Sequence, residues 1–214
     1  MTRNSSSSAD GGASLRIRRI RRSELPEEPV ALARFLIGKT IMREFPKSTQ
    51  RLSGRIVETE AYLPNDAAAH SFIGPTPRNR SLFLRPGHAY VYFCYGMHFM
   101  LNVSANRAGI GGGVLLRAIE PIEGIERMMR RRGTRRLLDL ARGPGRVAQA
   151  LAVDRRFDGA DLCAPGLLWL GTAARPADEI GVSLRIGITK DAHLPYRFYE
   201  RGNPYVSGPR RLNP

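Results

Sequence analysis

Two glutamates stand two residues apart in the segment from Val57 to Tyr62, which is rich in residues that favour β-strands. In a strand, alternate side chains point to the same face, so Glu58, Glu60 and Tyr62 are expected to share one face. Carboxylates at this spacing lie roughly 7 Å apart, the separation with which inverting glycoside hydrolases hold a water. The pattern therefore offers an acid–base pair, although two solvated glutamates on an exposed strand face explain it as well.

Four tyrosines fall on strand-like segments near this pair: Tyr62, Tyr90, Tyr92 and Tyr95. Aromatic faces beside a carboxylate and a basic surface suit the stacking of nucleic-acid bases. Packing in an ordinary core is the alternative that the pattern leaves open.

The charge of the chain indicates a polyanionic partner. Its 214 residues include 34 lysines and arginines but only 19 acidic residues, which gives a formal net charge of +15. Only Lys39, Lys47 and Lys190 are lysines, and the planar fork of the arginines matches phosphate groups. A genome rich in G and C explains the choice of arginine equally well, but it does not explain the net charge.

The elements that must position these residues follow from the spacing of apolar and breaker residues. An antiparallel sheet is predicted, with strands at residues 39–45, 52–62, 89–95, 98–104, 114–119, 167–170 and 180–189. Helices are predicted at residues 30–38, 121–131 and 143–152, and no clear periodicity marks 196–207. Gly96 and Met97 fit a two-residue type II′ turn, which places Tyr95 and His98 beside the tip of a hairpin.

One domain at residues 15–214 is expected after a disordered Ser-rich tail at 1–14. The long polar segment 65–87 is predicted to be a functional loop, or else to contain a short helix near 67–69. The arginine cluster at 130–136 is expected to be a solvated loop. No apolar run is long enough to cross a membrane, so no membrane partner is expected.

Neither a metal nor a nucleotide cofactor is expected. The four histidines and two cysteines are scattered without the paired spacing of zinc sites, and glycine-rich nucleotide motifs are absent. Two cysteines are too few for a disulfide scaffold, and the chain does not begin with a secretory signal. A reducing compartment, the bacterial cytoplasm, is therefore expected.

Several short segments share their order and spacing with one known family. They are RIVETEAY at 55–62, AAHS at 68–71, TPRNR at 76–80, YVYFCYGM at 90–97, LLRAIEP at 115–121, GPG at 143–145, QAL at 149–151, RFY at 197–199 and GNPYVS at 202–207. Together they resemble the eukaryotic-type alkyladenine (3-methyladenine) DNA glycosylases over about residues 27–207. The resemblance implies a single mixed α+β domain, a curved antiparallel sheet ringed by helices with a protruding β-hairpin. Such a domain binds duplex DNA from the minor groove and flips a damaged purine into a pocket.

The resemblance gives Glu60 a chemical role and leaves Glu58 without one. It implies that Glu60 activates the water that attacks the sugar C1′, that Arg117 helps to hold this water, and that a backbone carbonyl near Ile186 completes the water site. Strand cleavage by β-elimination needs an amine, and no lysine lies in the motifs from Glu60 to Tyr95. A monofunctional glycosylase that leaves the abasic site intact is therefore expected.

The same resemblance describes a base pocket and a DNA surface. Tyr92 is expected to stack on one face of the flipped base, with Tyr62 and His70 on the other. Asn102 is expected to exclude guanine by crowding its exocyclic amino group, and Tyr95 to be the wedge inserted into DNA. Contacts with the DNA backbone or groove are implied for Thr76, Arg78, Leu82, Met97, His98 and Arg146.

The expected function is base-excision repair by a monomer acting on double-stranded DNA. The expected substrates are 3-methyladenine and 7-methylguanine, with hypoxanthine and ethenoadenine as further candidates. A module that binds damaged DNA without cutting it is one alternative, because it needs the wedge and the charge but not Glu60. A carbohydrate glycosidase using Glu58 and Glu60 is the other, and it has little use for the net charge of +15.

Overall fold

The sheet is built around one long strand, β2 (Arg51–Tyr62). One edge of β2 pairs with β5 (Gly113–Glu123) along most of its length. The other edge pairs first with β1 (Thr40–Glu44) and then with β8 (Arg197–Glu200). The β2–β5 register shifts near Glu58, and such irregularities increase the local twist of a strand. The computed structural model describes residues 17–94, 96–173 and 175–213.

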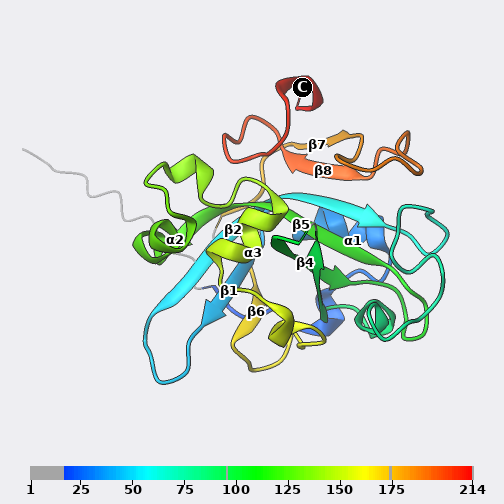
Figure 1. Ribbon diagram of the computed structural model, residues 1–214, viewed down its shortest axis with the longest axis horizontal. Coiled ribbons are helices and arrows are strands. Elements are labelled where there is room, and N and C mark those ends of the chain that lie inside the picture. Colours follow the sequence, from blue (N-terminus) through cyan, green and yellow to red (C-terminus); the bar gives the residue numbers. More distant parts are fainter. Residues whose placement is uncertain (1–16, 95, 174, 214) are drawn as a thin grey trace, which may run out of the picture.

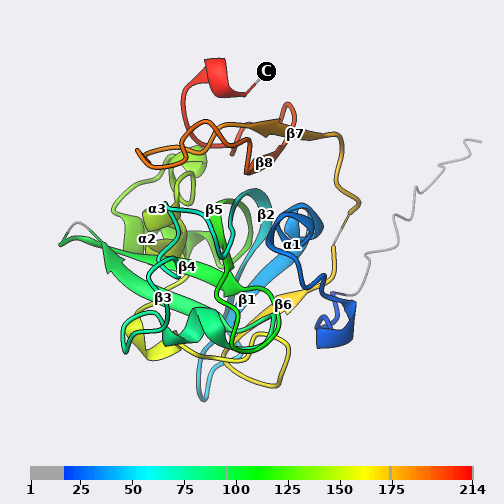
Figure 2. The ribbon, with the colours of Figure 1, turned by 90° about the vertical axis from the view of Figure 1, so that its right-hand side faces the viewer.

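The remaining strands extend the sheet in the order β3-β4-β5-β2-β1-β6. They are β3 (Ala89–Cys94), β4 (His98–Ser104), β6 (Leu168–Gly171) and, paired with β8, β7 (Ile180–Ser183). All of these pairs are antiparallel. Figures 1 and 2 show the sheet curling into a half-barrel, with β7, β8 and the C-terminal segment at one end.

Helix α1 (Pro29–Leu36) covers one face of this sheet. Glu28 caps it by accepting hydrogen bonds from the amides of Val30 and Ala31, and Pro29 fits the first turn, where no amide donor is needed. Leu32 and Leu36 lie on its buried side, so the helix is held by packing against β2 and β5.

Helices α2 (Ile125–Arg132) and α3 (Pro144–Ala150) lie together on the opposite side of the sheet, with α3 against β4 and β5 (Figure 2). Gly143 precedes α3 at φ +130°, a conformation that favours glycine. A Cβ atom on Gly145 would come within 2.9 Å of the His98 ring, so α3 can approach β4 only because this residue has no side chain. The close approach brings Pro144 to the edge of the cavity described below.

The predicted antiparallel sheet and its helices are confirmed, and most strands lie where the periodicity places them. The helix predicted at 121–131 begins too early, because β5 continues through Glu123 and α2 starts only at Ile125. Pro121 pairs with Gly54 inside the sheet, and Gly124 at φ +73° makes the turn into the helix. Arg130–Arg132 form the last turn of α2, so the predicted arginine loop is half helix.

One strand prediction near the C-terminus is wrong, and one strand forms where none was predicted. β7 ends at Ser183 instead of 189, because the chain then turns inward and buries Arg185. β8 lies in the segment where no periodicity is visible, since all four of its residues are buried and the charged ends, Arg197 and Glu200, are paired inside the protein.

The connection between β3 and β4 also differs from the prediction. Cys94 pairs with His98, and the Met97 amide donates to the Cys94 oxygen at 3.2 Å, so the strands do not close on the two residues Gly96 and Met97 alone. Tyr95 lies outside the described residues, as does the Ser-rich tail at 1–14.

The loop 65–87 contains hydrogen-bonded turns and a short 3-10 helix at Arg80–Phe83, and no helix forms near 67–69. None of the helices in the described part of the chain is long and apolar enough to span a membrane.

Candidate active site

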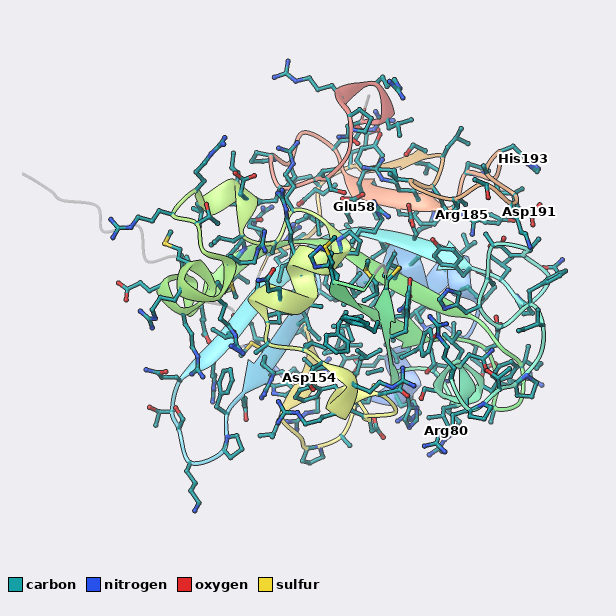
Figure 3. All side chains as sticks on the ribbon, viewed as in Figure 1. Glu58, Arg80, Asp154, Arg185, Asp191 and His193 are labelled. Carbon is teal, nitrogen blue, oxygen red and sulfur yellow. The ribbon has the colours of Figure 1, made fainter. Side chains whose placement is uncertain are left out.

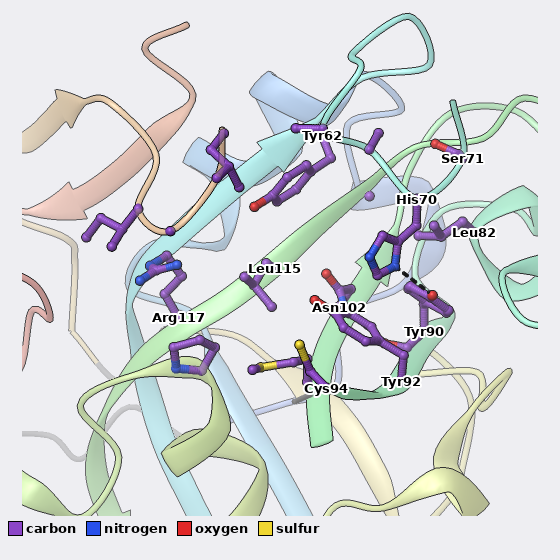
Figure 4. Close-up of a pocket in the computed structure, with 18 residues that line it drawn as sticks. Tyr62, His70, Ser71, Leu82, Tyr90, Tyr92, Cys94, Asn102, Leu115 and Arg117 are labelled. Carbon is purple, nitrogen blue, oxygen red and sulfur yellow. Dashed lines mark hydrogen bonds between the residues drawn. The ribbon is translucent and has the colours of Figure 1, made fainter. Parts of the chain in front are cut away.

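A cavity of about 340 Å³ opens on the side of the half-barrel where β2, β3, β4 and β5 meet the segment 186–188 (Figure 4). This volume lies within the range of roughly 300–1,000 Å³ that is typical of ligand sites. Its walls include Tyr62, Ala68, Ala69, His70, Ser71, Leu82, Tyr90, Tyr92, Cys94, Met100, Asn102, Leu115, Arg117, Pro144 and Ile186. The polar and aromatic residues that the sequence predicts for one site are therefore brought together from distant segments.

Glu60 lies directly behind the wall of this cavity and is fully buried. Its Oε1 accepts a hydrogen bond of 2.7 Å from the backbone amide of Ile186. Its Oε2 accepts from the Tyr62 hydroxyl at 2.9 Å and from Nη1 of Arg117 at 3.1 Å. All three donors belong to residues that line the cavity, so the carboxylate is oriented by the cavity wall itself.

The Tyr62 hydroxyl remains a donor over the whole physiological range. Burial, together with the neighbouring Glu60 carboxylate, raises the pKa of Tyr62 far above its ordinary value. The ring of Tyr62 faces the cavity from the side opposite Tyr92 and His70 (Figure 4).

Glu58 is equally buried but does not line the cavity. Its Oε1 accepts from Nε of Arg117 at 3.0 Å and from Nε of Arg197 at 2.7 Å, and its Oε2 accepts from the amide of Ser207 at 2.7 Å. Burial alone would raise the pKa of Glu58, but the charges of Arg117 and Arg197 outweigh it and hold the pKa below its ordinary value. Glu58 is therefore a buried carboxylate held in ion pairs outside the cavity. The carbohydrate-glycosidase alternative, which needs two carboxylates at the site, loses its second one.

Arg117, at the centre of β5, connects the two glutamates. Its Nε contacts Glu58 and its Nη1 contacts Glu60, so one rigid guanidinium fixes both carboxylates. Burial by itself would lower the pKa of Arg117, but the negative charges of Glu60 and Glu58 outweigh burial and raise the pKa above its ordinary value. The guanidinium therefore bridges the two carboxylates.

The aromatic side of the cavity is formed by a contiguous cluster. Tyr90 and Tyr92 are stacked with ring centroids 5.3 Å apart, and the His70 ring meets Tyr92 edge-on at 4.4 Å. His70 Nδ1 also lies 2.9 Å from the Tyr90 hydroxyl, and burial raises the pKa of Tyr90 to about 12. Partial burial and the charge of Arg78 lower the pKa of His70, so its imidazole is neutral near pH 7.

This cluster bears on the predicted stacking of a flipped base. Each stacked contact needs ~3.5 Å, so a base between Tyr92 and His70 requires the rings to stand roughly 7 Å apart. Because the two rings are in contact, His70 must move before it can lie across a base from Tyr92. The arrangement of the sandwich stays a prediction.

Asn102 is buried on β4 beside these rings and lines the cavity. Its amide nitrogen donates to the backbone oxygen of Tyr90 at 3.2 Å, which fixes the side chain. Tyr90 also lines the cavity: the four-tyrosine pattern includes it among the stacking candidates, whereas the family resemblance assigns it no role in the pocket.

The residues expected to contact DNA have diverse surroundings. Leu82 is buried in the cavity wall, whereas Met97 is 70% exposed on the β3–β4 hairpin. His98 is half-buried against Gly145, and Arg146 forms an ion pair with Asp139 at 3.2 Å.

Thr76 and Arg78 lie on the far side of His70. The Thr76 amide donates to Asn79 at 2.6 Å, which closes a turn, and both Thr76 and Arg78 line a second cavity of about 290 Å³. This second cavity shares its His70 and Tyr90 walls with the first.

Lys190 also lines this second cavity, close to the predicted base pocket. The sequence places Lys190 far from the motifs between Glu60 and Tyr95, and only the folded chain brings its amine near them. No local pattern could have revealed this proximity.

Among residues 17–94, 96–173 and 175–213, no three His, Cys, Asp or Glu side chains come together as a possible metal site.

Comparison with known proteins gives consistent matches over nearly the whole chain. The profile of the methylpurine-DNA glycosylase family matches residues 23–204. A Mesorhizobium japonicum protein described as a 3-methyladenine DNA glycosylase is 61% identical over 193 residues, which cover 90% of this chain and 92% of its own length. A similarly described Paraburkholderia phytofirmans protein is 50% identical, with coverage of 89% of each chain. The human DNA-3-methyladenine glycosylase is 44% identical over 83% of this chain and 64% of its own length.

Proposed function

This chain belongs to the methylpurine-DNA glycosylase family, and from that premise we propose that it hydrolyses the N-glycosidic bond of damaged purines in duplex DNA. One observation carries the proposal: a buried carboxylate, Glu60, is oriented by three donors that belong to the wall of a base-sized cavity. The net charge of +15 suits a polyanionic substrate.

Glu60 is the proposed general base. An ionised carboxylate offers about four acceptor positions, and the described contacts occupy three of them, which leaves one for a water. Glu60 takes a proton from this water as its oxygen attacks the sugar C1′ and the bond to the base breaks. Arg117 lies beside the carboxylate and can donate to the same water.

The aromatic cluster is the proposed site of the flipped base. Positive charge on an alkylated purine strengthens its attraction to tyrosine faces, and a charged base also leaves more easily. A neutral base such as hypoxanthine needs a proton donor, and the lowered pKa of His70 makes that imidazole a poor one. We therefore propose 3-methyladenine and 7-methylguanine as the preferred substrates, ahead of hypoxanthine and ethenoadenine.

The domain at residues 15–214 is proposed to act as a monomer in the bacterial cytoplasm. The residues that line the cavity all belong to this single chain, which supports a monomer. Tyr95 is proposed as the wedge because it belongs to the hairpin that carries the exposed Met97.

The test is base release from duplex oligonucleotides that each carry 7-methylguanine, hypoxanthine or ethenoadenine. The wild-type protein is expected to release 7-methylguanine fastest, and Glu60→Gln to slow release by roughly 10²–10⁴-fold while DNA binding is retained. Tight binding without release by the wild-type protein would instead indicate a damage-recognition module.

The monofunctional mechanism has its own test, because Lys190 lies beside the pocket. Borohydride reduces a Schiff base between an amine and the abasic sugar to a stable adduct. We expect no covalent protein–DNA adduct after borohydride treatment during turnover. An adduct that disappears in Lys190→Ala would show that this amine reaches C1′ and that the enzyme has lyase activity.

A further inference from the structure

Arg185 lies behind the proposed active site with its side chain fully buried, and it does not line the cavity. Its Nη1 and Nη2 form a two-pronged contact with the Asp66 carboxylate, in which Nη2 lies 3.1 Å from Oδ1. Nη1 also donates to the backbone oxygen of Ala61 at 3.1 Å, and Nη2 to that of Asp191 at 3.2 Å. The guanidinium therefore joins three separate segments of the chain.

Each of these segments carries part of the cavity wall. Ala61 precedes Tyr62 on β2, Asp66 begins the turns that lead to His70, and Asp191 follows the cavity-lining residues 186–188, which Arg185 itself precedes. The Asp191 carboxylate adds a parallel link by accepting from the amide of Ala67 at 2.7 Å. Figure 3 shows Arg185 and Asp191 side by side near β8.

The guanidinium also packs on the Tyr62 ring, with Cζ 4.7 Å from the ring centroid. Tyr62 donates to one oxygen of Glu60, and the Ile186 amide donates to the other. Arg185 thus packs against Tyr62, the first donor, and is the chain neighbour of Ile186, whose amide is the second donor. Two of the three groups that orient Glu60 are held by this one side chain.

We propose that Arg185 is a positioning residue for base excision, which holds Tyr62 and the Ile186 amide against the Glu60 carboxylate. The proposal rests on the function proposed for Glu60. A misplacement of about 1 Å in such a geometry can slow a reaction by roughly 10²-fold, so a residue outside the cavity can control the rate within it.

A matched control exists in the same protein. Arg55 and Glu200 form another two-pronged ion pair that is as buried as Arg185–Asp66, and neither residue lines the cavity. Arg55 also donates to the backbone oxygen of Pro176 at 3.1 Å, so it too links separate segments. A purely structural role for Arg185 predicts that the two arginines respond alike to substitution.

The experiment compares Arg185→Met, Arg185→Lys and Arg55→Met under single-turnover conditions on a 7-methylguanine duplex. Circular dichroism sets a temperature at which all variants are folded, and affinity is measured with a duplex carrying a tetrahydrofuran abasic analogue. Arg185→Met is expected to slow excision by about 10²-fold with unchanged affinity. Arg185→Lys is expected to recover part of the rate, because it keeps one contact with Asp66 but loses the fork.

Asp191→Gly provides a milder variant if the buried substitutions prevent folding. Asp191 has φ +47°, which glycine adopts readily, so the change removes only the link to the Ala67 amide. Slower excision at unchanged affinity, with Arg55→Met at the wild-type rate, supports the proposal. Equal rates for Arg185→Met and Arg55→Met, or a wild-type rate for every folded variant, would overturn it.

Glu60→Gln in the same assay separates this proposal from the one on which it rests. If Glu60→Gln excises at the wild-type rate, the proposed chemistry is wrong and Arg185 has no catalytic group to position. If Glu60→Gln is inactive and the Arg185 variants are not slowed, only the positioning role is overturned.

Discussion

Glu58 and Glu60 lie on the same strand and share the same arginine, yet they occupy two different kinds of environment. Around Glu58, the further described donors are Arg197, on β8, and Ser207, in the segment that follows β8. Around Glu60, the further donors are Tyr62 and the Ile186 amide, and both face a cavity. Residue type and burial are equal at the two positions, so what each glutamate can do depends on what covers it.

The register of β2 explains why two neighbours differ so much. Glu58 pairs with Tyr199, inside β8, whereas Glu60 pairs with Arg197, the first residue of that strand. Beyond β8, the Ala61 amide donates to the backbone oxygen of Tyr196 at 2.8 Å, and the segment 184–188 contributes the Ile186 amide to Glu60. The structural site therefore lies beside the middle of β8, whereas the proposed catalytic site lies beside the start of β8, next to the cavity.

The largest expected contrast is in stability. Glu58→Gln leaves Arg117 and Arg197 without a full negative partner in the interior, and loss of one member of a buried pair costs roughly 3–5 kcal/mol. Urea denaturation is expected to show this loss, while the folded fraction excises 7-methylguanine at close to the wild-type rate. A stable Glu58→Gln with abolished excision would assign the chemistry to the wrong glutamate.

A smaller contrast involves the hydroxyl donors of the two carboxylates. Tyr62 donates to Glu60 at 2.9 Å, and the Ser207 hydroxyl donates to Glu58 at 3.0 Å. A hydrogen bond to a charged group contributes about 1.5–3 kcal/mol, so Tyr62→Phe is expected to slow excision by roughly 10–10²-fold. Ser207→Ala is expected to lower the free energy of unfolding by a similar energy and to leave excision unchanged. If the two variants exchange these effects, the distinction between the sites fails.

The smallest expected effect is in the pH dependence of stability. The folded pKa of Glu58 is below its ordinary value of 4.5, so its contribution is fully present above that value and is lost as the pH falls through the folded pKa. The free energy of unfolding of the wild-type protein is therefore expected to fall more steeply with acidification below about pH 5 than that of Glu58→Gln. Parallel pH profiles would contradict the assignment of Glu58 as an ionised structural group.

Local pattern was enough to predict much of this architecture. The alternation in residues 57–62 placed both glutamates and Tyr62 on a strand, and the GPG motif at 143–145 marked the start of α3. The predicted strand boundaries are wrong where charged residues are buried in ion pairs, as at Arg185, Arg197 and Glu200. Sequence patterns treat a charged residue as exposed, and nothing in the local sequence shows that these residues are buried. Pro121 misled for a related reason, since proline is common at helix starts and here lies in a sheet.

The sheet, the helices and the family can be recognised from the sequence alone, because these depend on side-chain periodicity and on motifs that lie within short segments. That Glu58 is enclosed by ion pairs while Glu60 lies behind a cavity, and that Lys190 and Arg185 stand near the predicted pocket, follows from the folded chain. Burial and polar pairing arise here between segments more than 100 residues apart, such as Glu60 and Ile186. Spacing along the chain contains no information about such distances until the chain has folded.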